Sequence, residues 1–260
     1  MYDSFSSDYD RFVNWTNRLA YEMPFLLQQL QRVSSVQHPA SVLDSACGTA
    51  MHAIALAQQG YTAAGADLSA GMIAQARYNA EAAGVPLSLA TAGFGEMADA
   101  FSGQPFFPFD AVLCLGNSLP HLLTPQDLAA AMDDFAACLH PGGLVLIQNR
   151  NFDAVMQSRQ RWMEPQAHRE EQAEWIFLRF YDFLPDGLID FNIITLHRAG
   201  SQGWKQTITT TRLRPLPMAE IEEALEAAGF GDITFYGGMD GSPFDPQTSG
   251  NLVATALKIR

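Results

Sequence analysis

The first half of the chain alternates short apolar runs with segments of helical periodicity. Each apolar run is bounded by turn residues, which predicts a buried strand. Between the runs, apolar residues recur at every third or fourth position, which predicts amphipathic helices. Strands that are apolar throughout and alternate with helices indicate a parallel sheet covered on both faces. The predicted strands are 41–46, 61–68, 86–92, 109–116 and 143–150, and the predicted helices are 49–60, 70–84 and a third that starts at Pro125 behind the N-cap Thr124.

The pattern changes after Arg150, where apolar and polar residues alternate with a period of two. Three such runs, joined by turn signals rich in Gly and Asp, predict an antiparallel β-meander. Its large aromatic residues, Trp175, Tyr181 and Trp204, are expected in the core of this small sheet. The meander runs are 174–185, 188–199 and 204–214, and a helix at 218–230 with strands at 232–238 and 251–259 completes the main sheet.

Composition narrows the class of protein. The 260 residues are 48% hydrophobic and 17% charged, as in a globular protein with a full core. With 28 acidic and 15 basic residues, the net charge is −13, so we expect neither nucleic acid nor a membrane as partner. The three cysteines have no CxxC spacing, so neither a metal site nor a disulfide is expected. The N-terminus lacks the features of a signal peptide, which favours a cytoplasmic protein.

The turn after the first strand carries the strongest chemical signal. In VLDSACGTA (42–50), three small residues allow a ligand to approach the backbone at a helix N-terminus. Asp67 ends the next strand about 20 residues further on, where an acid holds ribose hydroxyls. Asp44 would repel a pyrophosphate but suits a ligand that ends in an ammonium group, which favours S-adenosylmethionine over a dinucleotide. His52 and Cys47, beside this turn, are expected to serve packing only.

Two motifs resemble those of class I S-adenosylmethionine-dependent methyltransferases. Residues 42–50 are similar to the family's V/I-L-D-x-G/A-C-G-T-G, and GADLSAGM (65–72) to its G-x-D-x-S-x-x-M. The resemblance implies an α/β fold with a Rossmann-like, seven-stranded, mostly parallel sheet, into which the meander is inserted. It also implies S-adenosyl-L-methionine as cofactor and S-adenosyl-L-homocysteine as product. Gly93 stands where many relatives carry an acid for the adenine, so adenine is expected against backbone groups and apolar side chains. The implied cofactor-binding residues are Arg18, Asp44, Ala46, Gly48, Asp67, Leu68, Met72, Phe94 and Leu115.

Segments around the fourth and fifth strands resemble the glycine N-methyltransferase branch of this family. They are FDAVLCLGNS (109–118), with a histidine shortly after it, and PGGLVLIQNRNFD (141–153). In that branch the arginine of the second segment holds the substrate carboxylate, and the resemblance implies this role for Arg150. A planar guanidinium suits a planar anion. Asn117 is expected beside the transferred methyl group, and Asn117, Arg150 and His121 are the predicted catalytic residues.

The segment before the first strand mixes aromatic with basic residues. In the same enzymes such a segment folds over the cofactor, and the resemblance places Arg18 near the cofactor's carboxylate. We therefore expect three parts in the chain. They are an N-terminal helical lid (1–40), an α/β domain that binds the cofactor (41–150 and 215–260), and an inserted antiparallel sheet that forms part of the substrate lid (151–214).

These features predict an enzyme that methylates a small molecule, such as an amine that bears a carboxylate, in the manner of glycine or sarcosine. An amine that arrives neutral needs no strong base, so positioning and exclusion of water suffice. Two alternatives stay open: an O-methyltransferase of a small carboxylic acid or phenol on the same fold, and a non-catalytic module that binds S-adenosylmethionine. A homo-oligomer is compatible with the sequence.

Overall fold

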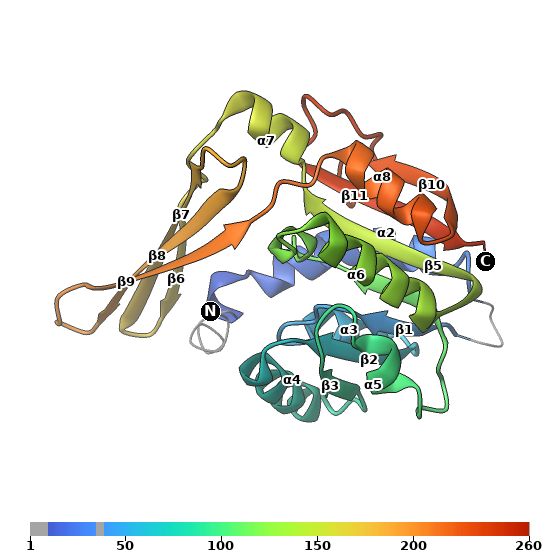
Figure 1. Ribbon diagram of the computed structural model, residues 1–260. Coiled ribbons are helices and arrows are strands. Elements are labelled where there is room, and N and C mark those ends of the chain that lie inside the picture. Colours follow the sequence, from blue (N-terminus) through green and yellow to red (C-terminus); the bar gives the residue numbers. More distant parts are fainter. Residues whose placement is uncertain (1–9, 35–38, 260) are drawn as a thin grey trace.

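A sheet of seven strands forms the centre of the computed structural model, which describes residues 10–34 and 39–259. The strands are β1 (Ser41–Asp44), β2 (Thr62–Asp67), β3 (Ser88–Thr91), β4 (Phe109–Cys114), β5 (Leu139–Arg150), β10 (Phe230–Tyr236) and β11 (Asn251–Lys258). Their order is β10-β11-β5-β4-β1-β2-β3 (Figure 1). β1 to β5 pair in parallel, whereas β11 pairs antiparallel with both β5 and β10. The predicted α/β fold with a mostly parallel sheet is confirmed.

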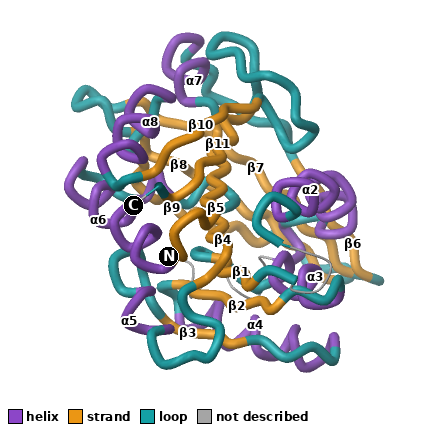
Figure 2. The backbone as a smooth tube through the Cα atoms, turned by 90° about the vertical axis from the view of Figure 1, so that its right-hand side faces the viewer, coloured by secondary structure: helices purple, strands orange, loops and turns teal. Residues whose placement is uncertain are grey.

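Helices cover both faces of this sheet (Figure 2). Three helices bury apolar residues such as Leu26 and Ile73 on one face, and three others bury residues such as Phe135 and Leu225 on the other. The first set is α2 (Trp15–Leu30), α3 (Met51–Gln58) and α4 (Ala70–Ala83), and the second is α5 (Met97–Phe101), α6 (Pro125–Cys138) and α8 (Met218–Ala227). Across the described ranges, no helix combines the length and the apolar character needed to cross a membrane.

A second sheet, antiparallel and four-stranded, is built from the chain after β5 and stands apart from the main sheet (Figure 1). The helix α7 (Phe152–Ser158) leads into it, and Asn151 caps that helix by accepting a hydrogen bond from Ala154 N at 3.3 Å. The strands, in spatial order, are β6 (Gln166–Glu170), β7 (Ala173–Phe183), β8 (Ile189–Ala199) and β9 (Lys205–Leu213).

Several details differ from the expected pattern. The sequence does not predict β6, because this exposed edge strand has no alternation of apolar residues. β5 begins at Leu139, earlier than expected, because Leu139 already pairs with Phe109 before the register shifts. Trp175 and Tyr181 are buried as predicted, but the prediction for Trp204 is wrong. That residue is 43% exposed, with the Arg198 guanidinium 4.7 Å above its ring.

Candidate active site

A cavity of about 1120 Å³ lies at the carboxyl ends of β1, β2, β4 and β5 and extends to the four-stranded sheet. This is the edge at which open parallel sheets bind ligands. Pockets for one drug-sized ligand measure roughly 300–1,000 Å³, so this cavity has room for a cofactor together with a second small molecule. The structure brings all the predicted site residues to its lining: Arg18, Asp44, Ala46, Gly48, Asp67, Leu68, Met72, Phe94, Leu115, Asn117, His121 and Arg150.

The turn between β1 and α3 forms one wall of the cavity. Gly48 and Ala50 both have left-handed backbone, with φ of 54° and 63°. This conformation explains why the related motif carries glycine at the third small position, since alanine there costs about 1 kcal/mol. Cys47 N donates to Ala66 O at 2.8 Å, and Gly48 N donates to Asp67 Oδ2 at 2.9 Å. The turn is therefore held against the end of β2.

Asp44 is a buried carboxylate without a full set of partners. It is 2% exposed, and its Oδ1 accepts no hydrogen bond from the described residues. Burial raises the pKa of Asp44 to about 6, although the charges of His52 and Arg18 oppose the shift. A buried acceptor left unpaired costs about 1–3 kcal/mol, so the site favours a ligand that donates to it. The ammonium group of S-adenosylmethionine fits this requirement.

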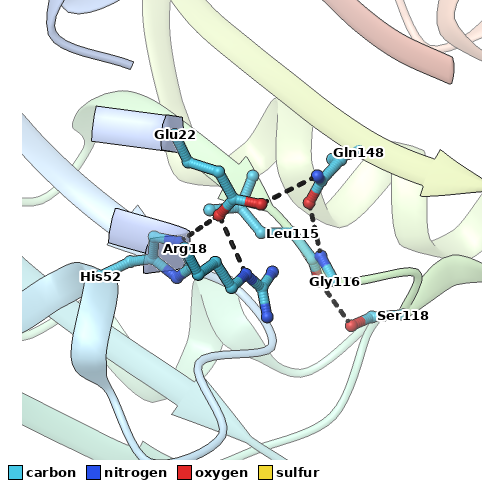
Figure 3. Close-up of polar contacts among 7 residues, drawn as sticks. All are labelled: Arg18, Glu22, His52, Leu115, Gly116, Ser118 and Gln148. Carbon is cyan, nitrogen blue, oxygen red and sulfur yellow. Dashed lines mark hydrogen bonds and ion pairs between the residues drawn. The ribbon is translucent and has the colours of Figure 1, made fainter. Parts of the chain in front are cut away.

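Glu22, on α2, is the centre of a buried polar network that the sequence analysis missed (Figure 3). Its carboxylate accepts from Arg18 Nε at 3.0 Å and Gln148 Nε2 at 3.0 Å, and it lies 2.6 Å from His52 Nε2. Burial by itself would raise the pKa of Glu22, but these partners outweigh it and the pKa is lowered. His52 therefore does more than fill space. Gln148 in turn accepts from Gly116 N at 3.1 Å, so the network extends to the end of β4.

The chain turns sharply after β4 and is fastened to β5 there. Gly116 and Asn117 adopt left-handed backbone, with φ of 75° and 69°; glycine and asparagine tolerate this region best. Asn117 N donates to Gln148 O at 3.0 Å, and the Asn117 side-chain oxygen accepts from Arg150 N at 2.9 Å. The two predicted acceptor-site residues, Asn117 and Arg150, therefore lie next to each other.

His121 lies on the short helix η1 (Leu119–His121) that follows this turn. Burial lowers the pKa of His121 to about 4. The imidazole is consequently neutral near pH 7, and it is a weak base.

The predicted adenine end of the cavity is lined by Leu68, Met72 and Phe94. Glu96, which the sequence analysis did not single out, also lines it and accepts from Gly93 N at 2.9 Å. A carboxylate is therefore present near the position where Gly93 lacks one.

The four-stranded sheet, expected from the sequence as part of a substrate lid, contributes a wall of the cavity through side chains that were not predicted as site residues. Arg179 and Tyr181 on β7 and Phe191 on β8 line the cavity. The N-terminal segment contacts the same sheet, since Phe12 packs edge-on against Phe177 with ring centroids 5.2 Å apart. For the β7 residues a sequence pattern exists, because the period of two along the strand places residues 177, 179 and 181 on the same face.

Comparisons with known proteins agree with this geometry. A family model described as a methyltransferase domain matches residues 42–143. The glycine/sarcosine N-methyltransferase of Halorhodospira halochloris is 29% identical over 154 residues, which cover 59% of this chain and 54% of that protein. The enzyme of the same name from Aphanothece halophytica is 26% identical over 240 residues, 90% of this chain and 81% of that protein. The crystal structure of an S-adenosylmethionine-dependent methyltransferase from Clostridium acetobutylicum ATCC 824 superposes with a TM-score of 0.75 at 17% identity, covering 98% of both chains.

Residues 42–143 therefore match a methyltransferase domain, and the fold is that of class I S-adenosylmethionine-dependent methyltransferases, a class whose cofactor is S-adenosylmethionine. Within this class its sequence resembles the glycine N-methyltransferase branch, as predicted. The alignment spans about half the length of the first of these relatives.

Proposed function

We propose that the protein transfers the methyl group of S-adenosylmethionine to the nitrogen of a small amine that also carries a carboxylate. The observation that carries this proposal is the pairing of Asn117 with Arg150 at the ends of β4 and β5, in the same cavity as the cofactor turn. A guanidinium forms strong, bidentate hydrogen bonds with a carboxylate. The names of the two relatives, both glycine/sarcosine N-methyltransferases, support an acceptor of this kind.

The cofactor would be held by the wall at β1 and β2. S-adenosylmethionine supplies a methyl group that is already activated on a sulfonium. Asp44 would bind its ammonium group, Arg18 its carboxylate and Asp67 its ribose hydroxyls, while Met72 and Phe94 would pack against the adenine. Asp44 Oδ1, which is buried and has no hydrogen-bond partner among the described residues, is the feature of this wall that most favours a cationic ligand.

The acceptor would be positioned by the opposite part of the cavity. Arg150 would hold its carboxylate, and Asn117, whose oxygen is bonded to the Arg150 backbone, would keep that strand end in place and offer its amide to the acceptor. Direct displacement needs the amine lone pair in line with the breaking C–S bond. Positioning and exclusion of water are therefore the main contributions of the protein.

The geometry favours an amine over a phenol. A phenol must lose its proton before or during transfer, which calls for a base of suitable pKa. The pKa of His121 is about 4, and the Glu22 carboxylate is engaged by three partners. A neutral amine needs neither group as a base.

Transfer of a radiolabelled methyl group tests the proposal. Glycine, sarcosine and dimethylglycine are compared with simple carboxylic acids and phenols, and the label is expected on the amines. Label on oxygen acceptors alone would select the O-methyltransferase. Saturable cofactor binding in a calorimeter, with no label transferred to any acceptor, would select the non-catalytic module. Binding of NAD in place of S-adenosylmethionine would overturn the cofactor assignment.

A further inference from the structure

Arg179 is a second cation on the acceptor side of the cavity. It lies two residues from Tyr181 on β7, so the two side chains share a face of the strand, and both line the cavity together with Arg150. The residues paired with them on β8 are Ile193 and Phe191, which are apolar and also line the cavity. Among the described lining residues, Arg179 is the single basic side chain that the four-stranded sheet contributes.

Arg179 differs from the other arginines of this sheet in its partners. Arg169, Arg198 and Arg212 each form an ion pair with a carboxylate, at 2.7, 2.8 and 2.9 Å. Within the ranges that the structure describes, no such pair involves Arg150 or Arg179. Arg179 Nε is buried and has no hydrogen-bond partner there. Of the other guanidinium atoms, Nη2 makes only a long contact of 3.4 Å with Glu164 O, while the group lies 5.2 Å from the centroid of the Phe12 ring.

The guanidinium groups of Arg150 and Arg179, neither of which forms an ion pair with a described residue, are close enough to affect each other. Burial and the charge of Arg150 both lower the pKa of Arg179. Burial raises the pKa of Tyr181, while the charges of both arginines and a hydrogen bond from Arg150 oppose that rise. Like charges in a half-buried cavity repel each other, and an anion that reaches both relieves the repulsion. One arginine already balances the single charge of one carboxylate, so the second arginine calls for additional negative charge.

We infer that Arg150 and Arg179 together select an acceptor amine with two units of negative charge, carried by two carboxylates or by one phosphate, over a singly charged acceptor such as glycine. This substrate class rests on the proposed function for the reaction, but the charge preference is a property of binding and can be measured without turnover.

The test measures acceptor binding by calorimetry to the protein saturated with S-adenosylhomocysteine. The ligands are glycine, aspartate and O-phosphoethanolamine, and the last two distinguish a second carboxylate from a phosphate. At least one of these two should bind about 10-fold or more tightly than glycine, because hydrogen bonds to charged groups contribute that much. Arg179→Gln should lower the affinity for that ligand by about 10- to 100-fold and the affinity for glycine by less than about threefold. Arg179→Lys should restore part of the loss, since it keeps the charge but not the planar fork.

Arg198→Gln is the matched control, because Arg198 lies on the same sheet but is ion-paired with Glu174 and does not line the cavity. It should leave all three affinities unchanged. An equal loss for glycine and the doubly charged ligands in Arg179→Gln would show that both arginines clamp one carboxylate. An unchanged preference would show that Arg179 only supports the sheet. Either result overturns the inference, provided that S-adenosylhomocysteine still binds normally and so reports a folded variant. A lack of methyl transfer would count against the proposed function alone.

Discussion

The two walls of the cavity are built in different ways. The wall at β1 and β2 consists of a backbone turn and acidic side chains, of which Asp44 is buried and Asp67 is bonded to the turn itself. The wall from β7 and β8 is lined by residues of an antiparallel sheet, such as Arg179 and Phe191. The first wall is thus part of the central sheet, whereas the second belongs to a separate sheet. Under the proposed function, the turn after β1 would therefore select the cofactor, and the inserted sheet would add to the selection of the acceptor by Asn117 and Arg150.

Substitution of Glu22 should weaken the binding of both the cofactor and the acceptor, and it has the largest expected effect. Glu22→Ala would remove the buried carboxylate that Arg18 and His52 contact. It would also remove the hydrogen-bond partner of Gln148, whose side chain anchors the end of β4. Removing one partner of a buried ion pair costs about 3–5 kcal/mol. We expect the free energy of unfolding in urea to fall by that amount, and affinity for both the cofactor and the acceptor to fall with it.

The control for this variant is Glu223→Ala, on the exposed side of α8. Exposed substitutions of this kind change stability by about 0.5 kcal/mol or less. If Glu22→Ala unfolds at the same urea concentration as Glu223→Ala, the network does not stabilise the fold.

Asp44 should affect the cofactor wall alone, and in opposite directions for stability and binding. In the folded protein the pKa of Asp44 is about 6, above its ordinary value of 3.8. Ionisation of Asp44 therefore destabilises the fold as pH rises through this range, by up to about 3 kcal/mol above pH 6. Asp44→Asn should be more stable than the wild type at pH 8. Its affinity for S-adenosylmethionine should nevertheless fall by at least about 30-fold, because a buried charge pair is lost.

Thermal unfolding and calorimetry at pH 8 check both halves of this prediction. Asp110→Asn is the matched control, since Asp110 accepts from Ser41 N at the other end of β1 and does not line the cavity. Normal cofactor affinity in Asp44→Asn would mean that the carboxylate has no part in binding.

The difference between the walls also decides what could be predicted from the sequence. The cofactor wall follows directly after strands, so small residues and acids at fixed spacing predict it, and Asp44, Gly48 and Asp67 all line the cavity. Arg179 could not be assigned, because the period of two separates the faces of a strand without showing which face meets the main domain. Placing that face requires the packing of two separate sheets, which no local pattern encodes.

Glu22 was missed for another reason, although a signal exists. It falls on the buried stripe of α2, three and four residues before Phe25 and Leu26. A glutamate on an apolar stripe indicates a buried partner, since a lone buried carboxylate is costly. The partners themselves, His52 and Gln148, come from α3 and β5, so their identity depends on tertiary structure.

Substitution of Arg150 should weaken acceptor binding and leave cofactor binding unchanged. Arg150→Gln removes the guanidinium that would hold the acceptor carboxylate, so the KM for that acceptor should rise by about 10- to 100-fold. The affinity for S-adenosylmethionine should stay the same, because among the described residues the Arg150 side chain forms no ion pair with the turn after β1. Initial rates at saturating cofactor, with calorimetry of the cofactor alongside, measure both quantities. Arg212→Gln, which removes an arginine paired with Asp190 outside the cavity, serves as the control. A KM that does not change in Arg150→Gln excludes the carboxylate clamp.

The smallest effect is expected for substitution of His121. The pH dependence of the variant's rate tests whether His121 transfers a proton or only helps to position the acceptor. Because burial lowers the pKa of His121 to about 4, the imidazole stays neutral from pH 5 to pH 8. His121→Asn should therefore lower the rate by less than about 10-fold, and the ratio of variant to wild-type rates should be flat across this range. The cofactor should behave differently. As pH falls through 6, Asp44 takes up a proton and loses the negative charge that would pair with the ammonium group, so the KM for S-adenosylmethionine should rise by up to about 10-fold per pH unit. A ratio of variant to wild-type rates that changes with the titration of a group near pH 6.5 would instead make His121 the base of the reaction.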